Sequence, residues 1–164
     1  MKILFLVFAF IILNSCGDNS PEPTKEIECG LENIVRTNLS GQILNYGALR
    51  DTNDWKTFAN QNAKGLENQF TLKYATPNPT SGYIIYEMAL EQSSKVKLYF
   101  NDSLMIESYI VQGINSFSLE LNNNPEGCYK IKAECYLGQT ENSPISNKIL
   151  TSSGRVIISR KIIF

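Results

Sequence analysis

The sequence predicts an all-β fold in which two antiparallel sheets pack face to face. From Gln69 onward, apolar and polar residues alternate with the period of two that is typical of half-buried strands. Turn-forming residues interrupt this alternation every 8 to 15 residues or so, which indicates about seven strands over residues 69–164. Because each strand has one apolar face, we expect an immunoglobulin-like β-sandwich.

The expected strands are separated by residues that favour turns. Residues 101–103 are expected to form a tight turn, residues 122–127 a loop, and residues 138–144 a longer polar connection. The last two strands are the least regular, and the first of them is expected to be a short edge strand. The predicted strands cover residues 69–74, 84–90, 95–100, 104–111, 116–121, 129–137, 145–150 and 156–164.

The first 15 residues are typical of a signal peptide rather than of a folded segment. Lys2 supplies a positive charge, and residues 3–13 are an unbroken apolar run of 11 residues. A run of this length is too short to span a bilayer but suits the apolar part of a signal peptide.

The stretch Leu13-Asn14-Ser15-Cys16, which follows this apolar run, resembles a bacterial lipobox. The resemblance implies that residues 1–15 are removed and that Cys16 receives the lipid. Several acyl chains on one residue hold a protein durably on a membrane. Gly17 stands where lipoproteins retained in the inner membrane carry aspartate, so the outer membrane is the expected location.

Two segments separate the lipid site from the sandwich. Residues 17–26 have no apolar side chain that could anchor a core and contain two prolines, so we expect residues 16–28 to form an extended tether. Residues 29–68 are expected to be an N-terminal extension with a short helix that begins near Asp54 and ends near Gly65. Trp55 would lie on this helix, either as a plug of the core or as a ligand platform. The first role is the more frequent one for a lone tryptophan.

Three motifs occur in order along the sandwich segment. They are Pro77-Asn78-Pro79-Thr80-Ser81-Gly82, then Gly127-Cys128-Tyr129, and finally an aliphatic terminus that contains Lys161. Together they resemble the C-terminal sorting domain of the type IX (Por) secretion system, over about residues 70–164. The resemblance implies a sandwich that engages the secretion machinery. It implies as sorting-motif residues Pro77, Asn78, Pro79, Gly82, Gly127, Tyr129 and Lys161.

The first motif also has a physical role of its own. Pro77 and Pro79 lack an N–H donor, so this stretch cannot pair as a central strand. Asn78 and Ser81 are expected to hydrogen-bond to nearby backbone groups. Gly82 is expected to let the chain turn into the next strand.

The second and third motifs have similar physical readings. Gly127 is expected to give the chain the same freedom before Tyr129. Lys161 lies among aliphatic residues, and we expect it to point to solvent from an edge strand, where a charge discourages strand addition. Contact with the secretion machinery is the alternative role for this lysine.

Three cysteines remain once Cys16 carries lipid, and disulfides can form beyond the inner membrane. Cys128 and Cys135 lie on one expected strand about 23 Å apart, so they cannot pair with each other. Cys29 can reach either of them. A disulfide between Cys29 and Cys128, with Cys135 buried on the apolar face, is the candidate that we favour.

Composition excludes several classes of function. The formal net charge of −1 and the lack of a basic cluster argue against nucleic-acid binding. The chain has no histidine, which excludes histidine-based triads and zinc motifs, and the cysteine spacing does not fit a metal site. The acidic pairs Asp51 with Asp54 and Asp102 with Glu107 read as turn and hairpin residues. We therefore expect no catalytic residues, no metal and no cofactor.

Two functions compete for a non-enzymatic, lipid-anchored protein of the cell envelope. In the first, the sandwich acts in type IX sorting or surface attachment at the outer membrane. In the second, the sandwich is retained at the cell surface as a binding or adhesion module for protein or glycan, through loops such as residues 122–126. A carboxylate glycosidase is a minor third reading, which would need two acids facing each other in a deep cleft.

Overall fold

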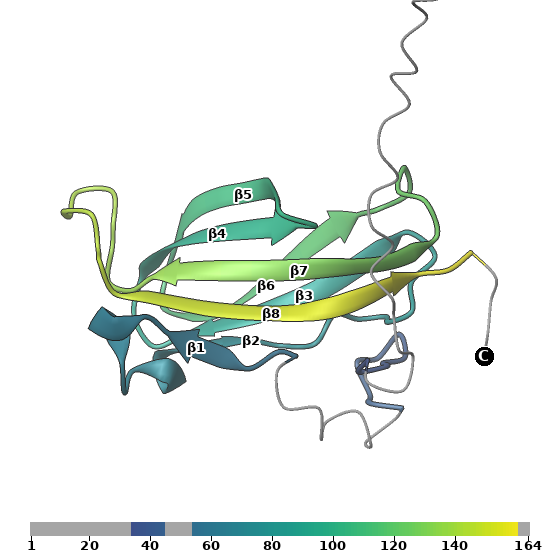
Figure 1. Ribbon diagram of the computed structural model, residues 1–164, viewed down its shortest axis with the longest axis horizontal. Helices are drawn as coiled ribbons and strands as arrows, with labels where there is room; N and C mark the ends of the chain where they lie inside the picture. Colours follow the sequence, from purple (N-terminus) through teal and green to yellow (C-terminus); the bar gives the residue numbers. More distant parts are fainter. Residues whose placement is uncertain (1–33, 45–53, 161–164) are drawn as a thin grey trace, which may run out of the picture.

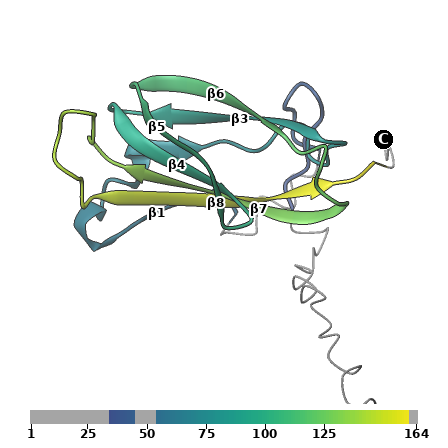
Figure 2. The ribbon, with the colours of Figure 1, turned by 90° about the horizontal axis from the view of Figure 1, so that it is seen from above.

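The computed structural model describes residues 34–44 and 54–160, which form a β-sandwich (Figure 1). Five antiparallel strands make one sheet in the order β1-β8-β7-β4-β5, and three make the other in the order β2-β3-β6. Figure 2 shows the two layers, with β3 and β6 on one side and β7, β8 and β1 on the other. The predicted all-β sandwich is confirmed. The strands are β1 Thr57–Ala59, β2 Phe70–Leu72, β3 Tyr83–Leu90, β4 Ser94–Phe100, β5 Ser103–Ile110, β6 Gly113–Glu120, β7 Gly127–Tyr136 and β8 Ile149–Ile158.

The strand order is that of an immunoglobulin-like sandwich. In the usual lettering, β2, β3 and β6 take the places of strands A, B and E, while β4, β7 and β8 take those of C, F and G. β5 lies beside β4 and takes the place of strand C′. Along β3, β4 and β8, residues that face the other sheet alternate with solvent-facing ones, as the period of two predicted, whereas β5 is exposed along most of its length. The largest fully buried side chains include Tyr86, Phe70, Ile34, Leu72, Ile84, Met88, Leu98 and Leu121.

The two irregular strands predicted at the end of the chain are one continuous strand. β8 runs from Ile149 to Ile158 and pairs with β7 along its whole length, so the predicted strands over residues 145–150 and 156–164 are wrong in their bounds. Gly154, which was expected to lie in the connection between them, is in the middle of β8. A Cβ atom at Gly154 would lie 2.0 Å from Cε2 of Trp55, so glycine is there to make room for the indole ring.

The predicted helix near Asp54 is also wrong, because this segment extends the larger sheet. Trp55 has a φ of 65° and donates its backbone N–H to the carbonyl of Ser153. Residues Thr57–Ala59 then form β1 along β8, followed by the 3-10 turns η3 (Gln61–Ala63) and η4 (Glu67–Gln69). Pairing to a strand edge satisfies the backbone groups that an isolated short helix would leave open to water.

Trp55 is a core residue, as its more frequent role predicted. Its side chain is 7% exposed and packs edge-to-face against Tyr74, with 6.1 Å between ring centroids. The indole covers Gly154 of β8 from the inner side of the sheet. Trp55 therefore closes the sandwich and offers no open ring face to a ligand.

Candidate functional site

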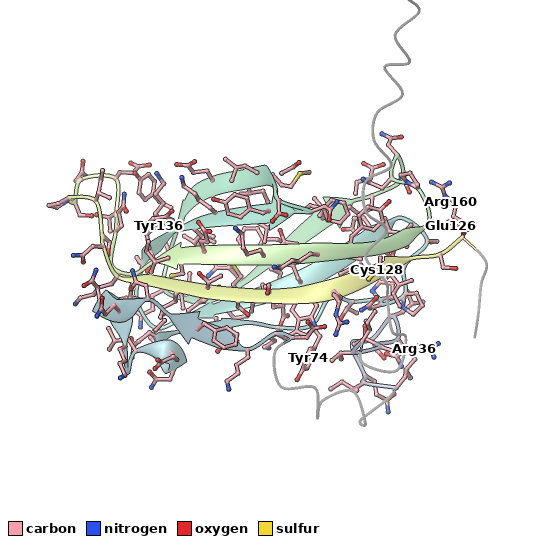
Figure 3. All side chains as sticks on the ribbon, viewed as in Figure 1. Arg36, Tyr74, Glu126, Cys128, Tyr136 and Arg160 are labelled. Atoms are coloured by element: carbon pink, nitrogen blue, oxygen red, sulfur yellow. The ribbon has the colours of Figure 1, made fainter. Side chains whose placement is uncertain are left out.

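The first two sequence motifs meet at one end of the sandwich, around the last residues of β8, the strand that leads into the third motif. On one side, β8 pairs with the start of β7, where Gly127 faces Ile158. On the other side, Thr80 of the first motif forms a parallel bridge with Ile158. Figure 3 shows Glu126, Cys128 and Arg160 at this end, opposite the end that carries Tyr136. We call this region the motif end.

Asn78 is the buried centre of the motif end. Its side chain is 0% exposed, and its Nδ2 donates to the carbonyls of Val35, at 2.8 Å, and Arg155, at 3.1 Å. Its Oδ1 accepts the backbone N–H of Ile157 at 2.9 Å. The expectation that Asn78 bonds to nearby backbone is therefore wrong, because its three side-chain bonds reach residues far away in the sequence. They join the N-terminal extension to β8.

Both proline peptides that flank Asn78, Thr76-Pro77 and Asn78-Pro79, are cis. The backbone of Asn78 pairs with Thr37 in both directions, and the Thr37 hydroxyl donates to the carbonyl of Ala75 at 2.7 Å. Thr37 is buried and was not foreseen from the sequence, since nothing in its local pattern distinguishes it from a loop residue.

Thr80, rather than Ser81, makes the local hydrogen bonds of the first motif. Its hydroxyl oxygen accepts the backbone N–H groups of Gly82 and Tyr83 and donates to the carbonyl of Tyr83 at 2.6 Å. Its backbone also bonds to β8 on both sides of the bridge, receiving from Ser159 and donating to Ile157. Ser81 is exposed. The signal that could have found Thr80 is a threonine directly after the second proline, a residue type that closes turns.

Gly82 is required by close packing at this turn. Its φ is +150°, and a Cβ atom there would lie 2.1 Å from Oδ1 of Asn122. Its carbonyl accepts the backbone N–H of Leu121, so the turn is tied to the end of β6. The predicted role of Gly82 as the entry to β3 fits this geometry.

The second motif forms a tyrosine corner. Tyr129 lies near the start of β7, its hydroxyl donates to the carbonyl of Pro125 at 2.8 Å, and its ring stacks on Phe100 with 4.9 Å between centroids. In sandwiches of this type, a tyrosine at the corner before strand F bonds back to the backbone in the same way. Gly127 has a φ of +156°, and the Tyr129 ring lies directly beside it. The Gly-x-Tyr spacing thus places the Tyr129 ring beside Gly127 and shapes the corner.

Arg160 closes the loop of residues 122–126. Its Nη2 donates to the carbonyls of Asn122, at 2.8 Å, and Asn124, at 3.0 Å. Its backbone N–H donates to the carboxylate of Glu126. These groups belong to the loop that was expected to bind a ligand in the adhesion reading, and in the folded protein they are engaged by the chain itself. Arg160 had no sequence signal beyond its place in the third motif. Lys161 lies outside the described residues.

The cysteines separate into a bonded and a buried one. Cys128 is disulfide-bonded, and Cys135 is a free thiol that is 0% exposed on the inner face of β7. Burial raises the pKa of the Cys135 thiol to about 11, against a weaker opposite effect of the hydrogen bond with Ser94. A thiol with so high a pKa is largely protonated and unreactive at neutral pH. Cys16 and Cys29 lie outside the described residues.

The acidic residues considered from the sequence are held in ion pairs or turns where the structure describes them. Asp54 accepts a hydrogen bond from Arg155 at 2.8 Å, and Glu107 pairs with Lys95 and Lys97 across β4 and β5. Asp102 lies in the β4–β5 turn with a φ of 66°, while Asp51 is outside the described residues. Over the described ranges, no group of three His, Cys, Asp or Glu side chains is placed to hold a metal ion.

The outer face of the five-stranded sheet carries a lattice of tyrosine, lysine and glutamate. Glu134 accepts from Lys132, Tyr99 and Tyr136. Burial works to raise the pKa of the Glu134 carboxyl, but these hydrogen bonds outweigh it and lower that pKa. Burial, together with the bond to Glu134, raises the pKa of Tyr99 to about 12. The Lys132 ammonium lies 4.2 Å from the centre of the Tyr99 ring. On this face Glu107 and Glu134 are both held by neighbouring lysines.

No protein-family model, curated protein or solved structure matches this chain. In the part of the chain that the structure describes, no helix has both the length and the apolar character needed to cross a membrane. The class that the fold itself defines is an eight-stranded, immunoglobulin-like β-sandwich.

Proposed function

We propose that the sandwich is a sorting or attachment module of the type IX secretion system in a lipid-anchored envelope protein. The observation that carries the proposal is the meeting of two distant motifs around the end of β8, the strand that leads into the third motif. Asn78 and Thr80 hold β8 from one side, and Gly127 and Cys128 hold it from the other. A recognition element fixed in this way loses little conformational freedom when a partner binds it.

Arg160 supports the same proposal. Through Glu126, Asn122 and Asn124, it fixes the direction in which the chain leaves the sandwich before residues 161–164. In the proposal, Lys161 and the residues after it are read by the secretion machinery, and the motif end positions them. The exposed loop of residues 122–126 would form the rest of the surface that the machinery contacts.

The second part of the proposal is that the N-terminal segment attaches the protein to the outer membrane. Cys16 would carry the lipid and residues 16–28 would form the tether. The described extension begins at Ile34 and pairs with Asn78 through Thr37, so the tether would join the sandwich at the motif end. Anchor and sorting motif would then lie on the same end, and the opposite end of the sandwich would face away from the membrane.

The test is a variant that ends at Arg160, studied in the native host. Because β8 ends at Ile158 and the contacts of Arg160 remain, we expect the melting temperature to be unchanged. Surface exposure, measured by protease shaving of whole cells, should fall strongly in this variant and in Lys161→Ala. The matched control is Lys130→Ala, which removes an exposed lysine of β7 and should leave display unchanged.

Undiminished surface display of a stable truncated protein would contradict the sorting function and favour a retained binding module. The intact mass of the protein isolated from membranes tests the remaining parts of the proposal. It should show a triacylated Cys16 and report any cleavage of the C-terminal domain. An unlipidated N-terminus would remove the anchor from the proposal.

A further inference from the structure

A groove of about 290 Å³ lies at the end of the sandwich opposite the motif end. Three connections build it: the β3–β4 loop through Ser93, the β5–β6 turn through Val111, and the β7–β8 loop through Gln139 and Asn142. Figure 1 shows the β7–β8 loop projecting from this end, far from the point where β8 finishes. In antibody variable domains, the loops between strands B and C and between strands F and G bind ligands at one end of the sandwich.

Gln139 is a largely buried polar side chain in the lining of this groove, and among the described residues only the oxygen of its amide has a hydrogen-bond partner. The residue is 6% exposed, and its Oε1 accepts the backbone N–H of Ser146 at 3.2 Å. This bond fixes the orientation of the amide, because only the oxygen can accept from an N–H group. The Nε2 group makes no hydrogen bond to any of the described residues and is not one of the fully buried atoms, so it is open to solvent in the groove. The amide therefore offers the groove an accessible donor whose orientation is fixed.

Another part of the lining is apolar and includes an aromatic ring. Tyr109 is 41% exposed, and Val111, which is 68% exposed, follows it at the end of β5. The Lys95 ammonium lies 5.7 Å from the centre of the Tyr109 ring and is itself paired with Glu107. The ring is therefore held in place, and the positive charge beside it is already neutralised.

The remaining lining is made of uncharged polar groups, with Glu141 as the single ionisable carboxylate. Ser93 and Thr140 present hydroxyl groups, and Asn142 presents an exposed amide. A lining that combines an aromatic ring and aliphatic side chains with hydroxyl and amide groups matches a sugar ring, which has an apolar C–H face and a rim of hydroxyl groups. An anionic ligand would find no free cation in this lining, and the volume is at the lower end of the range for small-molecule sites.

We propose that this groove, here called the distal groove, binds a neutral saccharide, with a sugar ring on Tyr109 and a hydroxyl oxygen on Nε2 of Gln139. Tyrosine with serine and asparagine is also the composition that adaptable binding loops use. The distal groove is independent of the motif end, so this function adds to the proposed sorting and does not rest on it.

The experiment is saturation-transfer NMR on the full-length chain in detergent, with the methyl glycosides of glucose, galactose, mannose and N-acetylglucosamine as probes. At least one should give a saturable signal. Gln139→Glu keeps the oxygen that accepts from Ser146 but removes the donor, and binding should weaken about fivefold, the effect of one lost hydrogen bond. Tyr109→Ala should weaken binding about tenfold.

The matched control is Tyr83→Ala, which removes a tyrosine of similar exposure (49%) from the other sheet and should leave binding unchanged. Circular dichroism on each variant verifies that the fold is intact. The proposal is overturned if none of the four glycosides binds. It is also overturned if Gln139→Glu and Tyr109→Ala both bind the glycoside as tightly as the unchanged protein does. A stronger response to an uncharged tetrapeptide than to any glycoside would show a protein-binding groove and would overturn it too.

Discussion

Asn78 and Ile157 are 79 positions apart in the sequence and are joined by a hydrogen bond of 2.9 Å between the Ile157 N–H and Oδ1 of Asn78. The bond links the first sequence motif to the strand that ends in the third. The same side chain donates to Val35 and Arg155, so one residue connects the N-terminal extension, the proline turn and β8. The asparagine of the first motif is thus a structural centre of the motif end.

Replacement of Asn78 by alanine should lower the free energy of unfolding by about 3 kcal/mol, because it removes three hydrogen bonds of a buried side chain to the backbone of Val35, Arg155 and Ile157. Urea denaturation followed by circular dichroism measures the change. Asn123→Ala, in an exposed loop, is the control and should change stability by less than about 0.5 kcal/mol. Equal effects of the two changes would show that the buried bonds of Asn78 contribute nothing.

The alternating pattern predicted most of the sandwich, because inward and outward residues of a strand are encoded locally. It identified β3, β4 and β7 and the buried face of each, as well as the buried thiol of Cys135. The alternating pattern failed where the type of a residue is set by its contact with a residue far away in the sequence. Gly154 reads as a loop residue until the indole of Trp55 is placed over it.

The same limit applies to the candidate site. The motifs were visible in the sequence, but the three long-range bonds of Asn78 were not, since an asparagine between two prolines is equally typical of a local turn. The roles of Thr80 and Arg160 depend on how the end of β8 is paired. The fixed orientation of the Gln139 amide depends on how the β7–β8 loop folds back on itself. Neither the pairing at the end of β8 nor the fold of the β7–β8 loop is encoded in a local sequence pattern.

Gly154→Ala should destabilise the protein by about 2 kcal/mol or more. The new methyl group would meet the Trp55 ring at 2.0 Å, in a core where added volume forces side chains from their preferred positions. Tryptophan fluorescence during urea denaturation reports both stability and the environment of the ring. Ser152→Ala is the matched control, two residues away on the same buried face.

The hydroxyl of Ser152 is buried and finds no hydrogen-bond partner in the described chain, so its removal should be neutral or stabilising. A destabilisation by Ser152→Ala as large as that of Gly154→Ala would contradict the packing argument, because it would show that any change at this position of β8 is costly.

Tyr129→Phe should lower the free energy of unfolding by about 1 kcal/mol. The change removes the hydroxyl that bonds to Pro125 and keeps the ring stacked on Phe100. Thermal and urea denaturation measure the effect. Tyr83→Phe, at an exposed hydroxyl with no hydrogen bond to the described residues, should have none. If the two changes have the same effect, the tyrosine corner does not stabilise β7.

Acidification should destabilise the sandwich, because it protonates Glu107 and Glu134, whose carboxylates pair with lysines on the outer face of the five-stranded sheet. The hydrogen bond from Lys95 lowers the pKa of Glu107, and that of Glu134 is lowered by its own hydrogen bonds against the opposing effect of burial. A carboxyl with a depressed pKa in the folded state stabilises the protein above its unfolded pKa of about 4.3. The stabilisation is lost as the pH falls through the lower, folded pKa.

We therefore expect the free energy of unfolding to decrease as the pH is lowered below about 4.3, and the decrease to be smaller in the double variant Glu107→Gln, Glu134→Gln. Urea denaturation at a series of pH values measures it. Glu91→Gln serves as the control, since Glu91 forms no ion pair with the described residues. If the pH dependence of the free energy of unfolding is unchanged in the double variant, Glu107 and Glu134 are not the source of that dependence.

Cys128 is disulfide-bonded while Cys135 is a buried free thiol, and the sequence predicts Cys29 as the partner of Cys128. Peptide mapping without reduction should recover a linked pair of peptides that contain Cys29 and Cys128. Iodoacetamide should modify Cys135 only after unfolding, because its pKa is raised to about 11 and its sulfur is shielded. Cys128→Ser should lower the free energy of unfolding by about 2 to 4 kcal/mol. A peptide that links Cys128 to Cys16 would contradict both this pairing and lipidation at Cys16, because one sulfur cannot carry both bonds.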